Sequence, residues 1–180
     1  MQTNRMLALD AMRGAAATFV TLYHFAQAFV PTAFGFTLGT PLFMLMSGDA
    51  AVAFFFVLSG SVNCRPVFRD PRPQSLLRSL LRRYPRLMLP AVVATLFSWA
   101  LFSLDLYHFR EAAAMTGSPW LASMANGITA DFQPSLLDAL YQGAIGCFVA
   151  GKSNYVPPLW TMHYELLGSM LVMADRKSVV

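Results

Sequence analysis

Two side chains suited to acid–base and anion chemistry lie near the start of the chain, an arginine and a histidine. Arg13 and His24 are separated by a run of small and apolar residues, 14–23. In an α-helix this spacing advances about 16 Å along the axis and turns about 20° around it, so both side chains share one face. A neutral imidazole suits a general base. The structural alternative is an anchoring arginine and a histidine that is hydrogen-bonded across helices.

A carboxylate, Glu165, lies about four residues into the last apolar run, 159–174, after Trp160. One interpretation pairs it with His24, whose ring it would orient. The other places it at a wet interface, where it only sets the depth of the helix. The residues alone leave both interpretations open.

A basic amphipathic helix is predicted over 75–87. Leucines and Tyr84 fill one arc of about 140°, and Pro85 is expected to kink or end the helix. Arginines on such a helix bind anionic lipid headgroups or the phosphates of a cytosolic cofactor. Without further information the lipid interpretation is favoured. The arginines of the opposite arc are Arg78, Arg82, Arg83 and Arg86.

The composition is that of a membrane protein. Of the 180 residues 56% are apolar and 12% charged, with a mean hydropathy of +0.50. This excludes a disordered chain, and two cysteines are too few for a disulfide scaffold. The net charge of +4 does not point to nucleic acid, because the basic residues lie between apolar runs. No metal site is expected, since the three histidines (His24, His108 and His163) lie on different elements.

The predicted fold is all-α and polytopic, one membrane domain over 1–180. Its basic residues lie on one side of the predicted membrane, apart from Arg110 and Lys152. The positive-inside rule therefore makes both termini cytoplasmic. The segment 135–150 is amphipathic and is interpreted as an interfacial or re-entrant helix of the outer loop, with a true span as the alternative. The four predicted spans are 15–36, 42–62, 87–106 and 159–174.

Four short motifs together resemble those of acyltransferase family 3, the integral-membrane acyltransferases that often O-acetylate cell-surface sugars. They occur in family order across almost the whole chain. Members of the family are longer, so the chain resembles their amino-terminal part. The motifs are LDAMRG at 9–14 with YHF at 23–25, FFVLSG at 55–60, RRYPRL at 82–87 through Pro90, and LWTMHYE at 159–165.

The resemblance implies an acyltransferase of the plasma (inner) membrane. An acyl-CoA, foremost acetyl-CoA, would approach from the cytoplasm, and the acceptor would be a hydroxyl of a cell-surface carbohydrate or another extracytoplasmic molecule. His24 becomes the candidate general base, with Arg13 and Glu165 as further catalytic candidates. Arg82, Arg83 and Arg86 become candidates for the phosphates of CoA. The alternative is a non-enzymatic membrane protein, an inert truncated fragment or part of a transporter.

Overall fold

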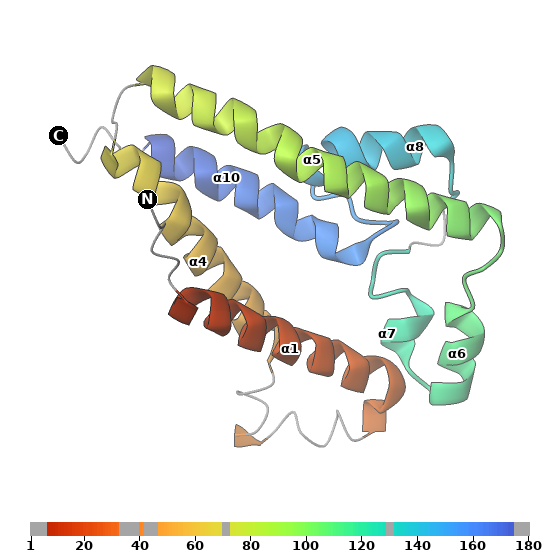
Figure 1. Cartoon of the computed structure of the whole chain (residues 1–180). Helices are drawn as coiled ribbons and strands as arrows, with labels where there is room; N and C mark the ends of the chain where they lie inside the picture. The colour runs from red at the N-terminus through yellow and green to blue at the C-terminus, as the bar shows by residue number, and fades with distance from the viewer. Residues whose placement is uncertain (1–6, 33–39, 42–46, 70–72, 129–131, 175–180) are drawn as a thin grey trace.

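The computed structural model describes residues 7–32, 40–41, 47–69, 73–128 and 132–174 and contains no strand within these ranges (Figure 1). The all-α expectation is therefore confirmed for the described chain. The elements are α1 (Leu7–Phe29), α4 (Gly48–Arg69), α5 (Pro73–Ser103), α6 (Phe109–Thr116), α7 (Pro119–Ala122), α8 (Leu136–Tyr141), a π-helical turn (Gln142–Gly146), α9 (Cys147–Val149), a 3-10 turn (Pro157–Trp160) and α10 (Thr161–Ala174).

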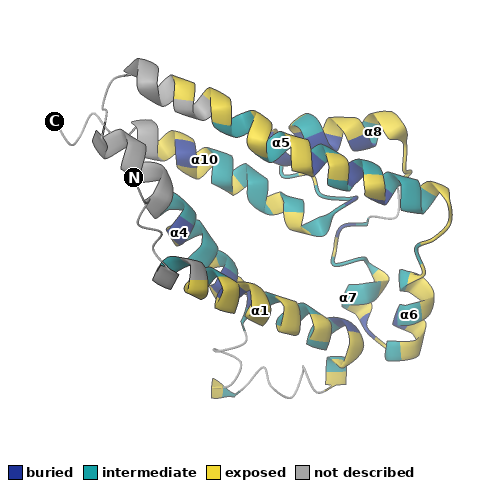
Figure 2. Cartoon of the chain, viewed as in Figure 1, coloured by how far each residue is buried: buried dark blue, intermediate teal, exposed yellow. Residues whose placement is uncertain are grey.

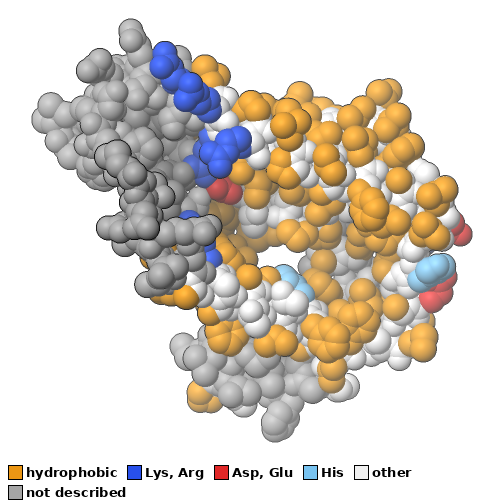
Figure 3. Space-filling view, viewed as in Figure 1, with side chains coloured by type: hydrophobic (Ala, Val, Ile, Leu, Met, Phe, Trp, Pro, Cys, Tyr) orange, Lys and Arg blue, Asp and Glu red, His pale blue; other side chains and the backbone are white. Residues whose placement is uncertain are grey.

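The four longest helices have one common end. The starts of α1 and α5 and the last turns of α4 and α10 lie on the left of Figure 1, whereas α6 and α7 lie beside the far end of α1. The Lys and Arg side chains visible on this face gather toward the left end (Figure 3). The clustering of charge that the sequence pattern predicts is thus present in space.

The predicted amphipathic helix and the predicted third span are one helix. The 31 residues of α5 continue through both Pro85 and Pro90, so the expectation that Pro85 ends the helix is wrong. Each proline removes one backbone hydrogen bond, but packing compensates for this loss. The hydroxyl of Tyr84 donates to the carbonyl of Ala144, and its ring lies 5.2 Å from that of Phe148.

The other helix bounds also shift from the predicted spans. Helix α1 ends at Phe29, shortly before Pro31, where the first span was expected to continue. Helix α4 begins at Gly48 and runs past the predicted end at 62, to Arg69. The predicted residues 33–36 and 42–46 lie outside the described chain. Within the described residues one helix, Leu81–Ser103, is long and apolar enough to cross a membrane, and Gly48–Gly60 and Leu136–Val149 are apolar but shorter. The count of four spans stays a prediction.

The segment 135–150 is helical and packs tightly along α5. A Cβ on Gly143 would lie 2.4 Å from Oγ1 of Thr95 and 2.7 Å from Cα of Val92, so only glycine fits. The main chain of Ser135 is bonded in both directions to the hydroxyl of Tyr155, at 2.9 and 3.0 Å. Burial of the phenol raises the pKa of Tyr155. Ser135 and Tyr155 are therefore adjacent, so the chain between them leaves this position and comes back to it.

The best-buried part of the molecule lies where α5 meets the segment α8 to α9 (Figure 2). Ala91, Cys147 and Phe148 form this core, and partly buried side chains from α5 and α10 pack against it. By contrast, apolar side chains on the outer surfaces of α4 and α5, such as Val57, Val93 and Phe97, are about two-thirds exposed (67%, 66% and 66%).

Candidate functional site

Arg13 and His24 lie on one uninterrupted helix. Because α1 is continuous from Leu7 to Phe29, their spacing places them on one face, about 16 Å apart along the axis. Both side chains are half-buried. The predicted common face is present in the structure.

The imidazole of His24 is held by contacts from three sides. Its ring stacks on the indole of Trp120 in α7, with 5.3 Å between centroids and 16° between planes. The ring of Tyr23 meets it edge-on at 5.3 Å. The main chain of Val20 and the carboxylate of Asp49 act on the imidazole electrostatically. Histidine, carboxylate and aromatic groups thus form one cluster from α1, α4 and α7.

A close helix contact brings Asp49 to this cluster. The buried Gly48 begins α4, and a Cβ on it would lie 2.6 Å from the ring of Tyr23. A larger residue would push the first turn of α4 away from α1. The space-filling view shows an opening between α1 and α10, beside α7, with a histidine side chain at its rim (Figure 3).

A second cluster joins α4, α5 and α10. The guanidinium of Arg83 forms an ion pair with the carboxylate of Glu165, and the two side chains are 22% and 20% exposed. The hydroxyl of Ser59 donates to Oε1 of Glu165 at 2.9 Å and accepts from Nη2 of Arg83 at 3.2 Å. The partner of Glu165 in the structure is therefore Arg83, and neither of the two interpretations left open by the sequence included this pair. The helix predicted over 75–87 continues into the predicted third span as one helix, and this helix places Arg83 beside α10.

The candidate phosphate-binding arginines separate into two kinds. Arg83 faces Glu165, whereas Arg82 and Arg86 are exposed. Residues four apart on a helix lie on the same face, so Arg82 and Arg86 form a stripe that Arg78, which is also exposed, extends. Guanidinium groups in such a stripe match the oxygens of a diphosphate.

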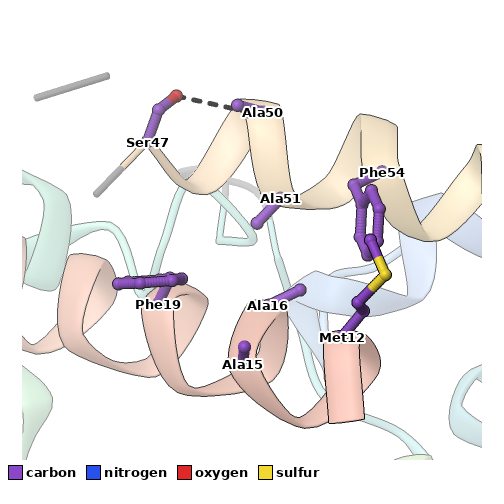
Figure 4. A pocket seen from close by; sticks show the side chains of 8 residues that line it. All are labelled: Met12, Ala15, Ala16, Phe19, Ser47, Ala50, Ala51 and Phe54. Carbon is purple, nitrogen blue, oxygen red and sulfur yellow. Dashed lines mark hydrogen bonds between the residues drawn. The ribbon is translucent and has the colours of Figure 1, made fainter. Parts of the chain in front are cut away.

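An open apolar groove of about 300 Å³ lies between α1 and α4 (Figure 4). Its one hydroxyl, that of Ser47, already accepts a hydrogen bond from the amide of Ala50 at 3.3 Å. The groove can accept a hydrocarbon chain but offers no acid–base chemistry. It is lined by Met12, Ala15, Ala16, Phe19, Ser47, Ala50, Ala51 and Phe54.

Sequence reasoning missed three residues of these clusters. Trp120 lies about a hundred residues from His24 in a four-residue helix, and no periodicity connects the two. Asp49 is the one charge in the apolar run 42–62, and nothing along the chain links it to His24. Ser59 is a small residue beside Gly60, a pattern typical of helix packing, yet its hydroxyl bonds the Arg83–Glu165 pair. A polar group in an apolar helix is a signal that could have identified Asp49 and Ser59.

The comparison with known families identifies the class of protein. The family described as "Acyltransferase domain" matches residues 6–175. Because the match covers nearly the whole sequence, the chain belongs to this family of acyltransferase enzymes.

A curated relative narrows the comparison further. The chain is 26% identical over 196 residues to the O-acetyltransferase PaAT-1 of Phomopsis amygdali. The alignment covers 92% of this chain and 39% of that protein, so the chain spans well under half of the relative's length. No solved structure matches the chain.

Proposed function

We propose that the chain takes part in moving an acetyl group from acetyl-CoA to a hydroxyl of a cell-surface carbohydrate or a similar acceptor. The observation that carries this proposal is the half-buried His24 in its aromatic and acidic cluster, on the same helix face as Arg13. Membership of the acyltransferase family and the name of the curated relative support it.

In the proposed reaction His24 is the general base. The acceptor oxygen bonds to the thioester carbonyl carbon while its proton passes to a ring nitrogen of His24. The C–S bond then breaks, and the leaving thiolate takes up the proton. A positioned base of this kind contributes about 10²–10⁴-fold to the rate. Asp49, which acts electrostatically on the ring, stabilises the imidazolium that forms.

The basic end of the molecule is the proposed side of donor binding. The exposed Arg82 and Arg86 would hold the nucleotide phosphates of CoA, and Arg13 would face the pantetheine end. Arg83 would contribute mainly through its ion pair with Glu165, which fixes α5 against α10.

The same arrangement supports residence in a bilayer with four crossing segments. Apolar side chains on the outer faces of α4 and α5 are exposed, as lipid contact requires. The main chain of Ser135 is hydrogen-bonded to the hydroxyl of Tyr155, and this favours a re-entrant segment between the two residues over a fifth crossing. With the basic end inside, the positive-inside rule puts both termini in the cytoplasm, and the plasma (inner) membrane is the proposed location.

Transfer of radiolabelled acetyl from acetyl-CoA to a methyl glycoside tests the proposal directly. The chain in phospholipid vesicles should give labelled ester and free CoA in equal amounts. Binding of acetyl-CoA without any transfer would contradict the proposal and favour an inert piece of a longer enzyme. Uptake of the glycoside without ester would favour a transporter.

A further inference from the structure

The short helix α7 is attached to the end of α1 that carries His24. The hydroxyl of Ser118, which is 1% exposed, donates to the carbonyl of Gln27 at 2.8 Å. The same oxygen accepts from the amide of Leu121 and so begins α7. One buried serine therefore fixes both the start of α7 and its distance from α1.

The chain that follows α7 is held in an unfavourable conformation. Met124, Ala125 and Asn126 have positive φ values of 46°, 57° and 62°, which residues with a Cβ rarely adopt. Such a turn persists only where neighbours fix it. Here Asn154 donates to the carbonyl of Gly127 at 2.7 Å, and Ser123 accepts from the amide of Asn126 at 3.1 Å. The position of α7 is thus determined from both of its ends.

These contacts place Trp120 against His24, and the two rings stack. With one ring face covered by the indole and the ring of Tyr23 edge-on beside it, the imidazole is held in one orientation. Stacking covers a face of the ring and not the ring edge that carries the nitrogens. A base that rotates freely spends little time in the productive geometry, and small misplacements cost large factors in rate.

We propose that Trp120, anchored through Ser118, is a positioning residue that holds the ring of His24 in the orientation needed for proton transfer. This inference rests on the proposed function of His24 as general base. It assigns to the α6–α7 segment a task that neither the family nor the curated relative names.

The stack can be tested without any activity, by tryptophan fluorescence. An imidazolium quenches an indole that it touches, so we would use the chain with Trp99→Phe and Trp160→Phe, in which Trp120 is the one emitter. Its emission should fall as the pH is lowered through the histidine range. The fall should be lost in His24→Gln and kept in the matched control His108→Gln. A fall that persists in His24→Gln, or none at all, would overturn the proposal.

The positioning role is tested by the kinetics of CoA release from acetyl-CoA with a methyl glycoside. Trp120→Leu should lower kcat about ten-fold with KM for acetyl-CoA unchanged, and Ser118→Ala should act in the same direction. Trp120→Phe keeps an aromatic face and should retain most of the activity. Equal loss in the Phe and Leu variants, or an unchanged kcat in Trp120→Leu, would refute the role. If no variant and no wild type released CoA, the proposed function would fail, and the fluorescence titration would still decide the stack.

Discussion

The ion pair between Arg83 and Glu165 is expected to hold three helices together. One carboxylate accepts from Arg83 of α5 and from Ser59 of α4, and it lies on α10. Both charged side chains are about one-fifth exposed, at 22% and 20%. An exposed ion pair contributes about 0–1 kcal/mol to the free energy of unfolding. Loss of one partner of a fully buried pair costs about 3–5 kcal/mol.

We therefore expect Glu165→Gln to lower the free energy of unfolding by about 2 kcal/mol, because the burial of the pair lies between these limits. For a chain of this length each kcal/mol shifts Tm by about 2–4 °C, which predicts a fall of about 4–8 °C. The assay is heat-induced unfolding of the chain in detergent micelles, followed by far-ultraviolet circular dichroism.

The chain provides a matched control in the contact between Nδ1 of His108 and the carboxylate of Glu111 at 3.2 Å, where the side chains are 71% and 70% exposed. Glu111→Gln should lower Tm by less than about 4 °C. A double-mutant cycle of Glu165→Gln with Arg83→Met should give a coupling free energy of about 1–2 kcal/mol. Equal effects of the two Glu→Gln changes, or a coupling near zero, would refute the reasoning.

Three further predictions concern packing, pH and donor binding. Gly143→Ala should lower the stability by about 1–3 kcal/mol, because its Cβ would overlap α5. Gly168→Ala, where no atom lies within 4 Å, should raise the stability, and an equal loss in thermal unfolding would contradict the packing. Above about pH 10 an unfolded chain loses the phenol proton that folded Tyr155 retains, so the stability should fall with rising pH. This fall should be smaller in Tyr155→Phe, which an alkaline series of Tm values measures. Arg82→Ala should raise KM for acetyl-CoA several-fold with Tm unchanged, whereas Arg110→Ala should leave KM unchanged, and a reversed order would contradict donor binding at the basic end.

The sequence pattern predicted the helices well where the signal is local. The apolar runs and the shared face of Arg13 and His24 follow from helical periodicity, and the clustering of arginines follows from their order in the chain. Helix bounds were less accurate. Pro85 was expected to kink or end the helix, but α5 continues through it, and Tyr84 beside it is bonded to the distant Ala144.

The residue types of the candidate site were predictable from the sequence, but which of these residues contact each other was not. For Glu165 the sequence left open a pairing with His24 and a place at a wet interface, and the structure pairs it with Arg83. The choice depends on how far α5 extends and how α10 lies against it, which no spacing along the chain reveals. Trp120 stacks on His24 from α7, which Ser118 bonds to the carbonyl of Gln27 in α1. Such contacts arise from tertiary structure alone.

The most direct test of the account is acetyl transfer by the His24→Gln variant, measured beside His108→Gln in the same vesicles. If His24 is the general base, the variant should lose at least about 100-fold in kcat, with KM for acetyl-CoA and Tm unchanged, whereas His108→Gln should match the wild type. Undiminished transfer by His24→Gln would contradict the account.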